Sequence, residues 1–321
     1  MKISIIGGGA LGSALAFNYA FNQKKVCLWN RTTITTEELL QRHQPINKNI
    51  LDHLDIKQSI AETVKDSDAI LICIKAQAVY NFLREYSSFL ISKPVVFCSK
   101  GIDSENLLLQ TELGEKTLKK TPLAVLTGPG FASDILAQKP IALTLACKDK
   151  ETSNTIQALL STSSIRPYLS SDIIGAQVGG ALKNVIAIAC GITEGKDLGV
   201  SARTAIMTRG FTEINKIGLA LGCESETLIG LSGLGDLTLT CNSIRSRNFN
   251  YGKELALERL KKDNNTIEGK GTAAAAYQIA NHFGLDVPII KSVFSVIKGT
   301  IGIDEAITSL LSRPLKSEMD H

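Results

Sequence analysis

The chain has 321 residues, of which 44% are hydrophobic and 21% are charged. Because a single hydrophobic core rarely grows beyond about 250 residues, this length predicts two folded domains, and the composition excludes disordered, collagen-like and disulfide-stapled proteins. The formal net charge is +4 with no run of basic residues, so we expect no nucleic-acid partner. Aromatic residues make up only 5% of the chain, which favours an α/β enzyme over a β-sandwich.

Neither a signal peptide nor a membrane segment is expected from the sequence. The apolar run at residues 3–6 is too short for the core of a signal peptide, and no window holds about 18 consecutive apolar residues. The seven cysteines are odd in number, lack metal-ligand spacing and mostly lie in apolar runs. We therefore predict a cytoplasmic protein with reduced, buried cysteines, no metal site and no insertion into a membrane.

The first half of the chain alternates short β-branched runs with amphipathic segments. The runs predict strands over residues 3–6, 26–29, 69–74, 95–98, 123–127, 141–147 and 165–169. The segments predict helices over residues 11–22, 79–90 and 152–161. This repetition indicates βαβ units in a mostly parallel sheet, although residues 31–57 show no regular pattern.

After residue 169 the pattern changes to long helices. Ser171 and Asp172 form a helix-start signal, and helices are predicted over residues 173–191, 202–221, 272–282, 289–298 and 305–311. The predicted fold class is thus α/β, with a Rossmann-like dinucleotide-binding domain over residues 1–170 and an all-α substrate and catalytic domain over residues 171–321.

The first predicted strand is followed at once by the pattern G-x-G-x-x-G, carried by Gly7, Gly9 and Gly12. These glycines permit a tight turn, a close approach of backbone to a pyrophosphate and close packing of helix on strand, while the helix N-terminus offers free N–H groups to the anion. A plain turn between strand and helix is the weaker interpretation. The pattern predicts a dinucleotide site.

The end of the second strand indicates which dinucleotide is bound. Proteins that use NAD usually place an acidic residue there for the 2′-hydroxyl of the ribose, whereas this chain has Asn30 and Arg31. A guanidinium pairs with a 2′-phosphate, so we expect NADPH to be preferred, with NADH not strictly excluded. The alternative is that Arg31 is a solvated side chain at a strand end.

A lysine stands in the middle of the most apolar predicted helix. Lys183 and Asn184 are flanked one turn earlier by Gly179 and Gly180 and one turn later by Ala187, which predicts open space for a ligand beside the ammonium. A desolvated lysine has a lowered pKa and can exchange a proton with an alcohol or a ketone. A lysine that reaches the surface from the helix edge is the alternative.

Three further segments carry polar groups suited to a site. Asp236 lies among glycines and apolar residues, where it either holds a lysine or caps a helix. Residues 246–248 combine a hydroxyl, a guanidinium and an amide, which suits a phosphate dianion, although taken alone they read as a surface loop. Lys100 follows a strand, at the edge of the sheet where open α/β sheets bind ligands.

Seven segments taken in order carry a family resemblance, namely residues 7–16, 99–101, 128–132, 180–188, 233–237, 246–248 and 267–269. Together they resemble the soluble NAD(P)-dependent glycerol-3-phosphate dehydrogenases in their bacterial form. The resemblance spans nearly the whole chain, and its Lys-Asn and Ser-Arg-Asn segments are far more specific than the glycine loop. It implies reversible reduction of dihydroxyacetone phosphate to sn-glycerol 3-phosphate for glycerophospholipid synthesis, by an enzyme that is commonly a homodimer.

The resemblance also implies roles for individual residues of this chain. Lys183 matches the proton donor and acceptor, and the polar groups around it match Lys100, Asn184, Asp236 and Thr240. The residues of this chain that match the family's substrate contacts are Lys100, Gly128, Gly130, Lys183, Asp236, Ser246, Arg247 and Asn248. The residues that match the family's cofactor contacts are Gly7, Gly9, Ala10, Leu11, Gly12, Arg31, Lys100, Ala132, Arg247, Thr266 and Glu268.

Two positions depart from the family pattern. Leu11 replaces an aromatic residue and so removes a flat surface beside the cofactor, and Gly130 replaces a Ser or Thr and so removes a hydroxyl near the substrate. A second NADPH enzyme, ketopantoate reductase, shares the opening glycine pattern but does not account for residues 128–132 or 246–248. A dinucleotide-sensing module without catalysis would explain the glycine loop and leave Lys183 unexplained.

Overall fold

The computed structural model describes residues 1–32, 50, 52–260 and 267–314. Eight strands form one sheet in the order β3-β2-β1-β4-β5-β6-β7-β8, in which only β6 and β7 pair antiparallel. The strands are β1 (Lys2–Ile6), β2 (Lys25–Trp29), β3 (Leu54–Lys57), β4 (Ala69–Ile72), β5 (Val95–Phe97), β6 (Leu123–Thr127), β7 (Ile141–Cys147) and β8 (Ile165–Ser170). The predicted mostly parallel sheet is confirmed.

Helices cover both faces of the sheet. They are α1 (Ala10–Phe21), α3 (Ile60–Val64), the 3-10 turn η2 (Ala76–Ala78), α4 (Val79–Leu90), α5 (Gln110–Thr117), α6 (Ala132–Leu136) and α7 (Lys150–Leu160). One face packs α1, α6 and α7, and the other packs α3, α4 and α5. Along β1, Ile3 and Ile5 belong to the first core and Ile6 to the second, because successive side chains of a strand point to opposite faces.

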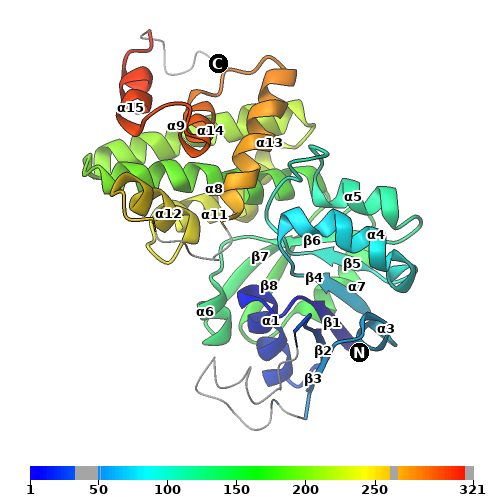
Figure 1. Cartoon of the computed structure of the whole chain (residues 1–321). Helices are drawn as coiled ribbons and strands as arrows, with labels where there is room; N and C mark the ends of the chain where they lie inside the picture. Colours follow the sequence, from blue (N-terminus) through cyan, green and yellow to red (C-terminus); the bar gives the residue numbers. More distant parts are fainter. Residues whose placement is uncertain (33–49, 51, 261–266, 315–321) are drawn as a thin grey trace.

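The rest of the chain is helical and lies beside the carboxyl ends of the central strands (Figure 1). Its elements are α8 (Ile173–Gly195), α9 (Gly199–Ala220), α10 (Ser225–Ile229), the π-helical turn η3 (Leu231–Gly235), α11 (Asp236–Cys241), α12 (Arg247–Ala256), α13 (Glu268–His282), α14 (Pro288–Lys298) and α15 (Ile303–Leu311). Asp172 begins α8 as predicted, since its carboxylate accepts a hydrogen bond from Gly175 N at 2.7 Å.

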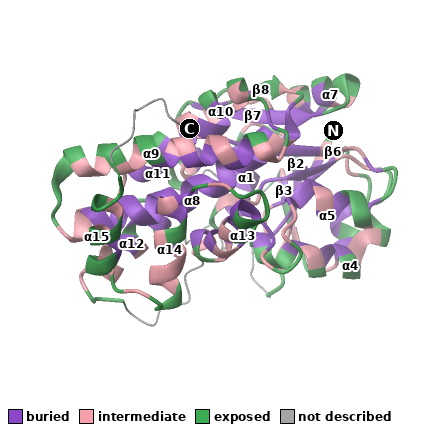
Figure 2. Cartoon of the chain, turned by 90° about the horizontal axis from the view of Figure 1, so that it is seen from above, coloured by how far each residue is buried: buried purple, intermediate pink, exposed green. Residues whose placement is uncertain are grey.

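Helix α8 is the core of the helical half. It is long and apolar enough to span a membrane by length and composition, yet 94% of its most apolar window is buried inside the protein. Helices α9, α11, α12, α13 and α14 pack around it, and the burial colouring in Figure 2 shows α8 almost entirely buried. Lys183 therefore lies in the interior of the molecule and not on a helix edge.

The structure differs from the predicted elements in several places, including the following four. The strand β3 lies in the stretch that shows no regular pattern, where Leu54 and Ile56 alternate with charged residues as in a strand with one solvated face. Helix α12 begins at Arg247, so the prediction of a surface loop at residues 246–248 is wrong. Helices α9 and α13 begin three and four residues earlier than predicted, at Gly199 and Glu268.

Candidate active site

The glycine loop between β1 and α1 has the geometry of an anion site. Gly7 has φ +116°, a conformation that L side chains rarely adopt, and a Cβ at Gly12 would come within 1.9 Å of the Gly7 carbonyl oxygen. A Cβ at Gly9 would meet nothing within 4 Å, so the space above the loop is open. No side chain caps the N-terminus of α1 and no acidic residue lies in its first turn. The uncapped N–H groups fit the pyrophosphate of a dinucleotide.

The other cofactor candidates lie around this loop or across from it. Ala10 and Arg31 are exposed, and Arg31 lies two residues after the end of β2. Leu11 is half-buried and packs against the core beneath α1. Ala132 is the first residue of α6, and Thr266 lies outside the described residues.

Lys183 lies at the centre of a buried polar cluster. Its Nζ donates to Asp236 Oδ1 at 2.6 Å and to Thr240 Oγ1 at 2.6 Å. The second oxygen of the same carboxylate, Oδ2, accepts from Lys100 Nζ at 2.7 Å, and Lys100 also donates to the Gly128 carbonyl oxygen at 2.8 Å. Asp236 thus holds one lysine from α8 and another from the end of β5, and the side chain does not serve as a helix cap.

Burial changes the acidity of the Lys183 ammonium. Its pKa falls from 10.5 to about 8, because desolvation lowers it most, the Asp236 carboxylate opposes that effect and the Lys100 charge adds to it. A lysine with a pKa near 8 carries a proton at neutral pH and releases it more readily than an exposed one. That is the property expected of a general acid or base.

The small residues of α8 do not leave the space that the sequence predicts. A Cβ at Gly179 would lie 2.7 Å from the Ser232 carbonyl oxygen, and a Cβ at Gly180 would lie 2.7 Å from Thr127 Oγ1. These glycines let the π-helical turn η3 and the end of β6 pack directly on α8. The prediction of open space beside Lys183 is therefore wrong at these two positions, because neighbouring elements fill it.

A chain of amides extends from the lysine cluster into the helical half. Asn184 Nδ2 donates to the Lys100 carbonyl oxygen at 3.4 Å, and its Oδ1 accepts from Asn248 Nδ2 at 2.8 Å. Asn248 Oδ1 in turn accepts from Gly269 N at 3.0 Å. Both amides are thus hydrogen-bonded within the protein, and they tie α8, α12 and α13 together next to the lysines.

The start of α12 combines a helix N-terminus with a guanidinium. Ser246 is the N-cap, and its hydroxyl accepts from Phe249 N at 3.2 Å. Arg247 is the first helical residue, so its positive charge lies at the end of the helix that already attracts anions. No acidic residue lies in this first turn. The arrangement suits a phosphate group.

Glu268 joins the helical half to the sheet. Its Oε1 accepts from Ala76 N at 3.4 Å, just after β4, and burial raises the pKa of its carboxyl. Gly128 and Gly130 follow β6, as Lys100 follows β5 and Gly7 follows β1. Because parallel strands end at one edge of a sheet, these residues line the boundary between the two halves.

Two residues near the cluster were not singled out by the sequence. Thr127 Oγ1 is buried without a hydrogen-bond partner among the described residues, facing Gly180. Arg245 bonds across the boundary to Asp134. Both are immediate neighbours of motif residues, Thr127 before Gly128 and Arg245 before Ser246, and that adjacency is the signal that could have found them.

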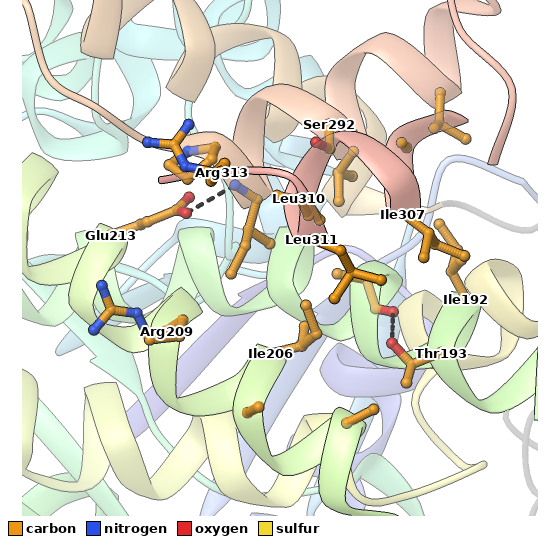
Figure 3. A pocket seen from close by; sticks show the side chains of 18 of the residues that line it. Ile192, Thr193, Ile206, Arg209, Glu213, Ser292, Ile307, Leu310, Leu311 and Arg313 are labelled. Atoms are coloured by element: carbon orange, nitrogen blue, oxygen red, sulfur yellow. Dashed lines mark hydrogen bonds between the residues drawn. The ribbon is translucent and has the colours of Figure 1, made fainter. Parts of the chain in front are cut away.

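A large cavity lies elsewhere, between α8, α9, α14 and α15 (Figure 3). It measures about 850 Å³, and none of the predicted site residues lines it. Figure 3 shows Arg209, Glu213 and Arg313 together at one side and Ile192 and Ile307 at the other. Among the described residues no group of three or more His, Cys, Asp or Glu is arranged to hold a metal ion.

Comparisons with known proteins agree along the whole chain. The sequence matches two protein-family models. The family described as NAD-dependent glycerol-3-phosphate dehydrogenase N-terminus matches residues 2–153, and the family described as NAD-dependent glycerol-3-phosphate dehydrogenase C-terminus matches residues 172–308. Similar proteins named glycerol-3-phosphate dehydrogenase [NAD(P)+] include one from Parvibaculum lavamentivorans, 40% identical with 99% of this chain and 98% of the relative covered. Another, from Cereibacter sphaeroides, is 42% identical with 98% and 100% covered.

A solved structure shows the same fold. The crystal structure of glycerol-3-phosphate dehydrogenase from Coxiella burnetii matches with a TM-score of 0.89 and 28% identity, covering 97% of this chain and 99% of that chain. The sequence resemblance and the predicted fold class are thus confirmed. The chain belongs to the family of NAD-dependent glycerol-3-phosphate dehydrogenases.

Proposed function

We propose that this enzyme catalyses the reversible reduction of dihydroxyacetone phosphate to sn-glycerol 3-phosphate, with Lys183 as the proton donor, and supplies glycerophospholipid synthesis. The observation that carries the proposal is the buried cluster in which Asp236 holds Lys183 and Lys100 by its two oxygens. Two ammonium groups then face the boundary where a ketone would bind, with a dinucleotide loop on one side and a cationic helix N-terminus on the other.

The proton transfer follows from the donors of Lys183. An ammonium has three N–H donors, and Asp236 and Thr240 accept two of them. The third donates to the carbonyl oxygen of the substrate and protonates it as the oxygen becomes an alcohol. Lys100 and Asn184 stabilise the negative charge that develops there. The dinucleotide, when bound, is the reductant of the ketone carbon.

The phosphate of the substrate anchors it without reacting. We assign this contact to Ser246, Arg247 and Asn248 at the start of α12, and the segment with Gly128 and Gly130 lies on the opposite side of the substrate. Binding energy from this remote group holds the carbonyl next to Lys183. Dihydroxyacetone without the phosphate is accordingly expected to be a very poor substrate.

NADPH is the proposed preferred cofactor, with NADH also used. Arg31 is exposed two residues after the end of β2, and residues 30–32, the described residues that follow the strand, carry no carboxylate, so a 2′-phosphate meets a cation there. The glycines Gly7, Gly9 and Gly12 hold the pyrophosphate, and the further contacts come from Ala10, Leu11, Ala132, Arg247, Thr266 and Glu268. No metal takes part in the proposed reaction.

We further propose a cytoplasmic homodimer whose two domains meet near residue 171. All seven cysteines are free, as suits a reducing compartment. The helical half exposes large apolar side chains at Leu198, Val200 and Leu311, which a second copy would cover.

The test measures the loss of absorbance as the purified protein oxidises the reduced nicotinamide cofactor. Dihydroxyacetone phosphate and ketopantoate are offered separately, each with NADPH and with NADH, to the wild type and to Arg31→Ala. We expect turnover of the phosphate alone, a lower KM for NADPH than for NADH, and a rise of roughly tenfold in the KM for NADPH in the variant.

Each other outcome removes one part of the proposal. Turnover of ketopantoate alone would mean that residues 246–248 do not bind a substrate phosphate. Turnover of neither ketone would favour a dinucleotide-sensing module without catalysis. An unchanged NADPH preference in Arg31→Ala would remove that residue from cofactor choice while leaving the reaction standing.

A further inference from the structure

One arginine beside the proposed phosphate site makes three contacts across the boundary between the two halves. The Arg245 guanidinium lies over the Phe131 ring, 4.5 Å from its centroid. Its Nη2 is 3.1 Å from Asp134 Oδ2, and it also donates to the Ser133 hydroxyl. A planar guanidinium can stack on a ring and bond through its edge at once, so one side chain satisfies all three partners.

The partners of Arg245 are held in place on the sheet side. Phe131 is the N-cap of α6, and Ser133 and Asp134 lie in its first turn. Lys139 Nζ donates to the other carboxylate oxygen of Asp134 at 2.9 Å. The hydrogen bonds from Lys139 and Arg245 lower the pKa of Asp134, so this carboxylate is charged at neutral pH. Arg245 therefore meets a fixed anion on a fixed turn.

Both ends of this contact adjoin the proposed substrate site. Phe131 directly follows Gly130, and Arg245 directly precedes Ser246, the N-cap of α12. Figure 1 shows α6 in the sheet half and α12 in the helical half on the same side of the molecule. The distance between these two substrate-contacting segments thus depends on contacts that residues on both sides supply.

We propose that Arg245 is a positioning residue whose contacts with Phe131, Ser133 and Asp134 form a clasp between the first turn of α6 and the start of α12. This clasp fixes the site between the two segments for the phosphate-bearing substrate. The inference rests on the proposed function. Arg245 does not touch the reacting atoms. It sets the relative position of the two segments that contact the substrate, so its loss weakens substrate binding more than it slows the chemical step.

The experiment compares Arg245→Ala, Arg245→Lys and Asp134→Asn with a matched control, Arg166→Ala. Arg166 also stacks on a ring, that of Tyr168 at 5.1 Å, but both residues belong to β8. Steady-state kinetics with dihydroxyacetone phosphate give KM and kcat for each variant. Hydrogen exchange of the amides of residues 131–136 and 246–250 reports the clasp without any need for turnover.

We expect Arg245→Ala to raise the KM about five- to tenfold, with kcat within about twofold of the wild type. Exchange in both segments rises, Arg245→Lys recovers part of the KM, and Arg166→Ala changes neither quantity. Asp134→Asn raises the KM less than Arg245→Ala does. In a double variant that combines Arg245→Ala with Asp134→Asn, the KM rises by less than the product of the two single effects, because both substitutions break the same contact.

An unchanged KM in Arg245→Ala overturns the inference, whether or not exchange rises, because the clasp would then not position the substrate. A fall in kcat with an unchanged KM overturns it as well, since Arg245 would then act in the transition state. If the wild type turns over no substrate, the proposed function fails first. Unchanged exchange in Arg245→Ala would then show separately that no clasp exists.

Discussion

At the scale of single residues, the site depends on Asp236, which is 1% exposed and accepts from two ammonium groups. A buried carboxylate is costly unless it is paired, and here each oxygen has its own cation. One of these cations, Lys183, belongs to the helical half, and the other, Lys100, belongs to the sheet. The same contact that orients the proposed proton donor therefore also holds the two halves together at the site.

The pKa of Lys183 near 8 predicts opposite pH profiles for the two directions of the reaction. Reduction needs the ammonium, so kcat/KM for dihydroxyacetone phosphate falls as the pH rises through about 8. Oxidation of glycerol 3-phosphate needs the neutral amine, so its kcat/KM rises over the same pH range.

Replacing the lysine with an apolar side chain of similar length, Lys183→Met, lowers the rate of reduction by about 10² to 10⁴.

Initial rates between pH 6 and 10 in both directions measure these profiles. Lys148→Met serves as the control, since this lysine forms an exposed ion pair with Glu115 far from the cluster. Near-ultraviolet circular dichroism tests whether Lys183→Met is folded. Robust turnover by the folded variant, or parallel profiles in the two directions, would refute the role of Lys183.

The sequence singled out Lys183 and Asp236, because polar residues inside apolar runs stand out, and Lys100, because it follows a strand at the ligand-binding edge of the sheet. It could not show that Asp236 bonds both lysines, since their contacts join residues 53 and 136 positions apart. It also misread Gly179 and Gly180. Small residues on a helix indicate close packing or open space equally well, and only the position of η3 and β6 decides between the two.

At the scale of elements, α9 holds α14 through one buried carboxylate. Glu213 accepts from Ile289 N at 2.8 Å and from Ile290 N at 2.9 Å, and so satisfies two N–H groups in the first turn of α14. Burial raises the pKa of Glu213 from 4.5 to about 7, and the two backbone hydrogen bonds oppose the shift. The capping residue thus comes from another helix, which no local sequence signal reveals.

This raised pKa gives the free energy of unfolding a defined pH dependence. Between pH 4.5 and 7 the folded state keeps a proton on Glu213 that the unfolded state has lost, so stability falls as the pH rises through this window. The expected loss is roughly 3 kcal/mol. Glu213→Gln cannot titrate, so its unfolding free energy falls less over the same range. Glu213→Ala also loses the cap, at a cost of about 1–2 kcal/mol.

Urea unfolding at several pH values from 4.5 to 8 measures the difference between the variants. A suitable control is Glu115→Gln, which changes an exposed acid of the sheet half and keeps the wild-type pH dependence. Equal slopes for the wild type and Glu213→Gln would show that Glu213 is already charged below pH 7.

Elements whose apolar residues recur at a regular spacing were predictable from the sequence, and elements without such a spacing were not. The seven predicted strands and the long helices α8 and α14 are present because apolar runs of fixed period determine them. The short strand β3 pairs only with β2, at the edge of the sheet, and has two apolar residues. Helix α12 has three glycine and asparagine positions that weaken its pattern, and packing on α8 stabilises it nevertheless.

At the scale of the whole molecule, the helical half carries an apolar surface that none of the described residues covers. The cavity of Figure 3 lies there, and next to it Leu198, Val200 and Leu311 are 44%, 66% and 81% exposed. Composition gave no means to separate such a surface from the core, because both use the same residue types on amphipathic helices. The exposed fractions separate them, and they locate the surface on α9 and α15 and the turn before α9.

A homodimer that covers this surface predicts that the purified protein sediments at twice the mass of one chain. Val200→Glu and Leu311→Glu place a charge where apolar side chains would meet, so both variants shift the equilibrium toward the single chain. Ile244→Glu is the control, since Ile244 is 71% exposed but lies before α12, outside the residues that line the cavity. Sedimentation equilibrium at micromolar concentration measures all four proteins. A wild type that sediments as one chain would contradict the dimer. A dimer unchanged by both substitutions would place its interface on another face.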